Sequence, residues 1–123
     1  MKDCLFCKII KGDIPCYKVY EDDKVIAFLD INPHGVGHTL VIPKEHCLNT
    51  IDASDEIILS CFNVIKKIYP AIDKAFDPMG IRIVQNNKVY QDIKHLHFHI
   101  VPGYKKEMDY SLEEALKLIK DNI

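Results

Sequence analysis

The sequence lacks several features that would assign it to a specialised class of protein. No apolar run approaches the roughly 18 residues that a membrane-spanning helix needs. No internal repeat, low-complexity block or Pro/Gly-rich linker divides the 123 residues. The five cysteines are an odd number, and they are too sparse for a disulfide scaffold. These absences exclude a transporter, a collagen-like protein, a disordered tail and a secreted mini-protein.

A strong charge of either sign is also missing, because 16 Lys and Arg face 18 Asp and Glu, for a formal net charge of -2. We therefore expect no global attraction to nucleic acid or to an anionic membrane, so that any phosphate ligand must be held by local groups. The polar residues 1–4 do not resemble a signal peptide. Together with cysteines kept as thiols or metal ligands, this predicts a reducing, cytoplasmic location. Apolar residues make up 48% of the chain, which predicts one compact domain over residues 1–123.

Apolar and β-branched runs bounded by turn residues predict five strands. The polar residues Glu21 to Lys24 separate the first two strands and indicate a hairpin. Pro43 is expected to stop the third strand. The predicted strands are residues 17–21, 24–29, 38–42, 81–84 and 95–101.

One long helix is predicted over residues 53–75, because apolar residues recur there at three- and four-residue spacing. Asp52 is its expected N-cap, and Pro70 is expected to kink or divide it. The run Ser-Leu-Glu-Glu at 111–114 matches a capping box and predicts a short amphipathic helix after it. These elements predict an α+β domain with a mostly antiparallel sheet.

The unusual feature of the sequence is the strict alternation His95-Leu96-His97-Phe98-His99. In a strand, alternate side chains share a face, so the three histidines would lie on one face while the apolar residues face the core. Three interpretations follow: a solvated face that happens to be rich in histidine, a metal site, or a catalytic site that uses imidazole as nucleophile and phosphate ligand.

Two motifs together resemble the histidine triad (HIT) family of nucleotide hydrolases and transferases. The first is Gly-His-Thr-Leu-Val-Ile-Pro-Lys at 37–44, within a longer similar stretch over residues 20–46. The second is His-Leu-His-Phe-His-Ile-Val-Pro at 95–102. The resemblance covers roughly residues 4 to 102 in the family's order, and it implies a HIT-like fold with one long helix and a short C-terminal helix.

The resemblance implies that His97 attacks the α-phosphorus of a nucleotide. Its other ring nitrogen would donate to a backbone carbonyl in the same strand, that of His95. His99 would contact the α-phosphate, and His38 would lie near the phosphate and the leaving group as a candidate proton carrier.

The resemblance also implies a nucleotide site around Asp30, whose carboxylate would bind the ribose hydroxyls. The structural alternative is an Asp that forms a turn before Asn32. Residues 85–94 depart from the family pattern, because the usual Gly-rich run is shortened and Asp92 stands where Ser or Thr is common. A carboxylate near a phosphate is electrostatically unfavourable. Apolar residues would sandwich the base and polar residues would reach the phosphate and the leaving group: Phe6, Ile9 and Ile31, then Asn86 and Gln91.

A zinc site is the last implication of the resemblance. The pair Cys4-x-x-Cys7 alone could equally be a redox motif. In relatives that carry this pair, the positions of His46 and His95 complete a Cys₂His₂ site, which would be closed and therefore structural. The remaining cysteines match no ligand pattern.

The leading hypothesis is therefore a hydrolase of purine nucleoside phosphoramidates that forms a covalent nucleotidyl-histidine intermediate. The alternatives are a dinucleoside polyphosphate hydrolase with the same residues, a nucleotide- or partner-binding module with little turnover, and a zinc-stabilised scaffold. The resemblance also implies a homodimer in which two sheets join.

Overall fold

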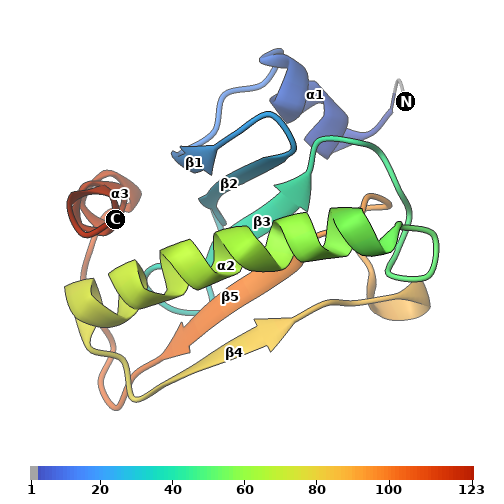
Figure 1. Cartoon of the computed structure of the whole chain (residues 1–123). Helices are drawn as coiled ribbons and strands as arrows, with labels where there is room; N and C mark the ends of the chain where they lie inside the picture. The colour runs from blue at the N-terminus through green and yellow to red at the C-terminus, as the bar shows by residue number, and fades with distance from the viewer. Residues whose placement is uncertain (1–2) are drawn as a thin grey trace.

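The computed structural model describes residues 3–123 and has the predicted α+β architecture (Figure 1). No helix among these residues is long and apolar enough to cross a membrane. The elements in chain order are α1 (Leu5–Lys11), β1 (Lys18–Glu21), β2 (Val25–Leu29), β3 (Thr39–Pro43), α2 (Asp55–Phe76), β4 (Gly80–Val84), the 3₁₀ turn η1 (Lys88–Tyr90), β5 (Phe98–Gly103) and α3 (Leu112–Asp121).

The five strands form one antiparallel sheet in the order β1-β2-β3-β5-β4. Every residue of β2 and β3 is buried, because both faces of the sheet are covered at its centre. On one face Ala27 and Val41 pack in the core beneath α2, while on the other Phe28 and Leu40 pack with Phe6 of α1. The predicted hairpin is confirmed as β1 and β2.

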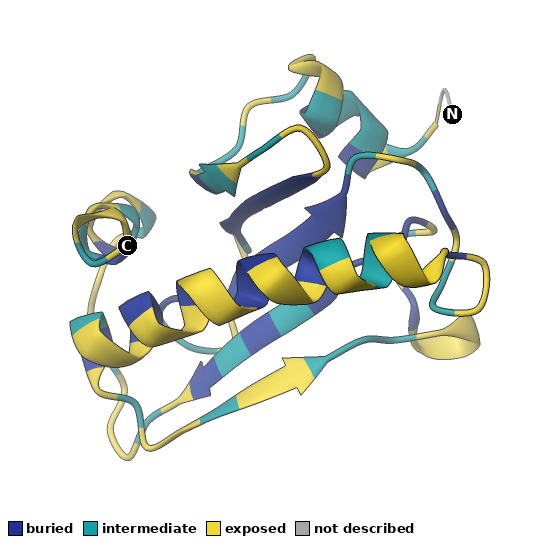
Figure 2. Ribbon diagram, in the orientation of Figure 1, coloured by how far each residue is buried: buried dark blue, intermediate teal, exposed yellow. Residues whose placement is uncertain are grey.

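Helix α2 lies across the sheet and buries its apolar stripe against it, while its outer side is exposed (Figure 2). It runs unbroken through Pro70, so of the two expectations for this residue, a kink or a division, the division is wrong. Buried residues before and after the proline, Ile68 and Ile72, both reach the core, and this packing offsets the hydrogen bond that proline cannot donate. The N-cap is Ser54, whose hydroxyl accepts from Ile57 N–H, whereas the carboxylate of Asp52 accepts from Leu48 N–H.

Two further differences from the predicted elements concern the site. The sequence analysis did not predict α1, which begins at the N-cap Cys4 and ends at Gly12, a residue with a φ of 88° that glycine adopts without strain. The last strand begins at Phe98 rather than His95, so the first two histidines of the alternating run precede the paired strand. The predicted capping box at Ser111 and Glu114 is confirmed.

The core beneath α2 can be tested by truncation. Ile68 is fully buried there, so Ile68→Ala should lower the free energy of unfolding by about 2–5 kcal/mol through lost burial and a cavity. Leu59 lies on the same helix with 61% of its surface exposed, and Leu59→Ala should cost less than about 1 kcal/mol. Urea unfolding of both variants measures the difference. Equal losses would contradict the packing described for α2.

Candidate active site and metal centre

The histidine face of the sheet is covered by α1 rather than exposed. His95 and His97 retain 0% and 3% of their surface, and Phe6 of α1 packs its ring edgewise on both, with centroids 6.0 Å and 4.9 Å away. His38 reaches the same region from the start of β3 and is 2% exposed. The interpretation of these histidines as a solvated strand face is therefore wrong.

His97 has its ring proton placed by the backbone. Its Nδ1 lies 2.7 Å from the carbonyl oxygen of His95, which confirms the predicted partner. A carbonyl oxygen can only accept, so Nδ1 carries the proton and Nε2 of the neutral ring keeps a lone pair. Such a ring can attack an electrophile through Nε2.

A second backbone group sets the protons of His38 and His99. The N–H of His34 donates to Nδ1 of His38 over 3.1 Å, so the proton of the neutral His38 ring sits on Nε2. That nitrogen lies 2.9 Å from Nδ1 of His99, which must then accept. His99 is left with its proton on Nε2, a buried atom with no hydrogen-bond partner among residues 3–123. A buried unpartnered donor favours an acceptor from a ligand.

Burial keeps these two rings neutral. It lowers the pKa of His38, and it lowers the pKa of His99 to about 4, with the neighbouring His97 and His38 adding to the effect. Both rings are therefore neutral near pH 7, which is the state in which the hydrogen bonds above assign a single proton to each.

The carboxylate of Asp30 both stabilises a turn and faces His38. One carboxylate oxygen accepts from Asn32 N–H over 2.9 Å, as expected of a turn residue. The other lies 3.6 Å from Nε2 of His38 and so faces the histidines. The turn interpretation of Asp30 is confirmed, and its binding of ribose hydroxyls stays a prediction.

A cavity of about 260 Å³ opens beside these histidines. Many of the predicted site residues line it, and they come from α1, from the loop that follows β2, and from β5 with the residues just before it. The predicted residues that line it are Phe6, Ile9, Asp30, Ile31, His97 and His99.

Three predicted residues do not line the cavity: His38, Asn86 and Gln91. The amide of Gln91 is 5% exposed and donates to the carbonyl of Leu48 over 2.7 Å, so it anchors a loop. Sequence analysis also missed Phe28 and Leu40, which do line it. The signal was available, because strands with apolar residues on both faces must be covered on both.

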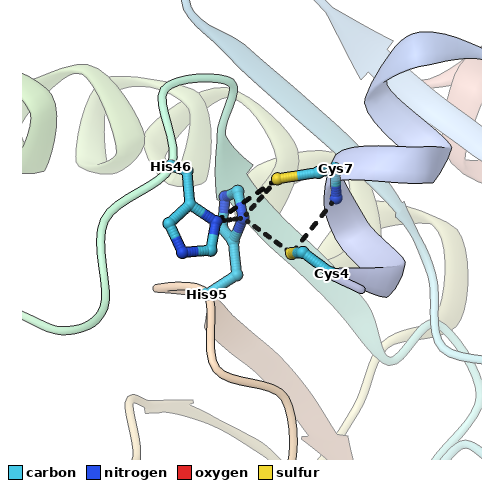
Figure 3. A group of neighbouring side chains, drawn as sticks. All are labelled: Cys4, Cys7, His46 and His95. Carbon is cyan, nitrogen blue, oxygen red and sulfur yellow. Dashed lines mark hydrogen bonds between the residues drawn. The ribbon is translucent and has the colours of Figure 1, made fainter. Parts of the chain in front are cut away.

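Four metal-binding side chains converge next to the cavity (Figure 3). The Sγ atoms of Cys4 and Cys7 lie 3.3 Å and 3.5 Å from Nδ1 of His95, and Cys7 Sγ lies 3.3 Å from Nδ1 of His46. The two Nδ1 atoms are 3.1 Å apart. Zinc bound at its usual lengths would give edges of about 3.3–3.8 Å between ligand atoms, so these residues fit a tetrahedral ion.

The surroundings of this cluster also suit a metal. Nε2 of His95 lies 2.8 Å from the carbonyl oxygen of Pro43, which places the proton there and leaves Nδ1 free to bind an ion. Burial lowers the pKa of His95, which keeps the ring neutral as a ligand must be. Burial also raises the pKa of Cys47 to about 11 and of Cys61 to about 12, so these thiols stay protonated outside the cluster.

Comparisons with known proteins agree with this geometry. The model of the HIT domain matches residues 11–106. The chain is 49% identical over 107 residues to Protein hit of Bacillus subtilis, covering 85% of this chain and 74% of that protein. It is 44% identical over 106 residues to the adenosine 5′-monophosphoramidase hnt1 of Schizosaccharomyces pombe, covering 85% and 77%.

Solved structures show the same fold. A Hit-like protein from Bartonella henselae superposes with a TM-score of 0.91 at 41% identity, covering 100% of this chain and 98% of that one. A histidine triad family protein from Mycobacterium smegmatis, described as Zn-bound, superposes with a TM-score of 0.90 at 32% identity, covering 98% and 93%. The family model alone spans most of the chain, and these similarities extend over nearly all of it. The chain therefore belongs to the histidine triad (HIT) family.

Proposed function

We propose that the protein hydrolyses purine nucleoside 5′-phosphoramidates, releasing an amine and the nucleoside monophosphate. The observation that carries the proposal is the 2.7 Å hydrogen bond from His97 Nδ1 to the His95 carbonyl, at the wall of the cavity. In the neutral ring this bond leaves the lone pair on Nε2, so that nitrogen can attack an electrophile directly.

The reaction takes two displacements at phosphorus. Nε2 of His97 bonds to the α-phosphorus while the phosphorus–nitrogen bond breaks, and the leaving amine takes a proton from solvent water. A water molecule then bonds to phosphorus, Nε2 leaves, and a proton returns to solvent. The covalent nucleotidyl-histidine divides one difficult hydrolysis into two easier steps.

The neighbouring side chains bind and orient the nucleotide. The unpartnered Nε2–H of His99 can donate to a non-bridging phosphate oxygen and stabilise the charge there. The carboxylate of Asp30 on the cavity wall would accept from ribose hydroxyls, and the apolar residues Phe6, Ile9 and Ile31 would contact the base. His38 holds His99 in the tautomer that donates.

The phosphoramidate class is favoured by the similarity to the S. pombe relative, whose name states that activity. A dinucleoside polyphosphate hydrolase would use the same nucleophile and would differ in its leaving group. A binding module with little turnover would keep the cavity but would not need an unprotonated Nε2 at its wall. A zinc-stabilised scaffold would need neither.

We further propose that Cys4, Cys7, His46 and His95 hold a structural Zn²⁺. The distances among their donor atoms and the Zn-bound relative support this assignment. Four protein ligands complete the tetrahedral coordination of the ion. The metal would therefore link α1 to the segments that carry His46 and His95, and it would take no part in the phosphate chemistry.

The homodimer and the cytoplasmic location remain part of the proposal. Strand β4 is an outer strand of the sheet, and Ile83 on it is 38% exposed, so this edge is available for joining a second sheet. The five cysteines form no disulfide, which suits a reducing compartment.

The nucleophile is tested by substitution. His97→Ala should abolish single-turnover release of AMP from adenosine 5′-phosphoramidate, a fall of at least about a thousandfold, while AMP still binds. His34→Ala is the control: its ring is exposed and lies 5.4 Å from the ring of His38, but the hydrogen bond to His38 comes from its backbone N–H, which alanine keeps. Rapid release by His97→Ala, or no release by the native protein, would contradict the proposal.

The metal is tested by its content and its effect on stability. The purified protein should hold one zinc ion per chain, and Cys7→Ser should lose it. The variant should unfold about 10 °C or more below the native protein, since even about 3 kcal/mol of lost metal binding shifts Tm that far. Cys16→Ser should keep its zinc, because Cys16 lies outside the cluster. An unchanged zinc content in Cys7→Ser would rule the site out.

A further inference from the structure

Asp92 lies next to the atom that does the chemistry. Its Oδ1 is 3.6 Å from Nε2 of His97, the lone-pair nitrogen, and it also accepts from Ile93 N–H over 2.8 Å. The side chain is 80% exposed. A negative charge at this distance from the nucleophile faces an electrophile that is itself negatively charged, so its presence calls for an explanation in terms of substrate.

Within the described part of the chain, the ring of His97 is the only group in ion-pair distance of the Asp92 carboxylate. Among residues 3–123, no lysine or arginine nitrogen lies within 4.0 Å of its carboxylate. The nearby Lys94 directs its ammonium to the backbone carbonyls of Lys88 and Gln91, at 3.2 Å and 3.0 Å. No lysine or arginine of residues 3–123 therefore competes with a ligand for the carboxylate of Asp92.

The space beyond Asp92 can receive part of a ligand. Asp92 and Ile93 line the cavity beside the histidines and also a second hollow of about 490 Å³, so the two spaces meet at these residues. The second hollow is bordered by Asp3, Lys94 and the metal-site residues Cys4 and His46. A loaded Cys₂His₂ zinc site is formally neutral, because two thiolates balance the ion, and the charges of Asp3 and Lys94 are opposite, so Asp92 supplies the remaining charge of this border.

The leaving group must come within reach of this charge. A reacting phosphorus sits about 3–3.5 Å from the attacking nitrogen, and the leaving atom is one bond further on. Since Oδ1 of Asp92 is 3.6 Å from that nitrogen, the leaving atom lies within about one Debye length of the carboxylate. A charge on the leaving group therefore interacts electrostatically with the carboxylate of Asp92.

We propose that Asp92 is a specificity-determining residue that selects leaving groups by charge, favouring amines that carry an additional positive charge and disfavouring anionic leaving groups such as phosphates. The inference rests on the proposed function and names its substrate class more closely. It also separates the phosphoramidate activity from the polyphosphate alternative, because a phosphate leaving group would add negative charge beside a carboxylate.

The test uses three adenosine 5′-phosphoramidates whose amines end in an ammonium, a methyl group or a carboxylate on the same three-carbon linker. The native kcat/KM should fall in that order, with about a tenfold range between the charged pair. Asp92→Asn keeps an oxygen for Ile93 N–H and should shrink this range by about three- to tenfold. Salt at about 0.5 M should shrink the native range as well.

The control variant is Asp73→Asn, which removes an exposed carboxylate from α2 and should keep the native range. Equal kcat/KM for the three compounds, or an unchanged range in Asp92→Asn, would overturn the role of Asp92 while leaving the proposed function in place. Binding of the same compounds to His97→Ala is measured in parallel. Binding in the predicted charge order without any native turnover would instead overturn the proposed function and retain the charge selection.

Discussion

Three backbone groups decide what the buried histidines can do. The carbonyls of His95 and Pro43 can only accept, and the N–H of His34 can only donate, so each assigns the proton on the ring that it contacts. The assignments leave a lone pair on Nε2 of His97, a lone pair on Nδ1 of His95 and a donor on Nε2 of His99. The proposed nucleophile, metal ligand and phosphate ligand would thus arise from one residue type, because each ring has a different hydrogen-bond partner.

The two faces of the sheet contribute to different parts of the molecule. Alternate residues of β2 and β3 face α2 on one side and α1 on the other, so one face holds the main core while the opposite face supports the cavity and the metal ligands. Cys4 is the N-cap of helix α1, and Phe6 on the inner side of this helix packs against His95 and His97. An ion bound by Cys4 and Cys7 would therefore hold the cover of the active site in place without entering the reaction.

Local patterns in the sequence predicted much of this arrangement, and long-range contacts account for the rest. The hairpin and the capping box at Ser111 follow from short-range rules of turns and caps, whereas the carbonyl partner of His97 followed from the resemblance to the HIT family. The continuity of α2 through Pro70 depends on packing against distant strands, which no window of sequence contains. The anchoring of Gln91 to Leu48 joins residues 43 positions apart, and the contact of Asp92 with His97 depends on the same loop. Local sequence rules could predict neither contact, because both depend on how the loop before β5 folds against the rest of the chain.

The central claim is that the backbone fixes the histidine tautomers, and ring-nitrogen NMR tests it most directly. A long-range ¹H–¹⁵N spectrum of the zinc-loaded protein near pH 7 distinguishes protonated from unprotonated ring nitrogens. The account predicts the proton of His97 on Nδ1 and the protons of His38 and His99 on Nε2. A proton on Nε2 of His97 in the neutral ring would contradict it, because the nitrogen assigned to attack phosphorus would then have no lone pair to use.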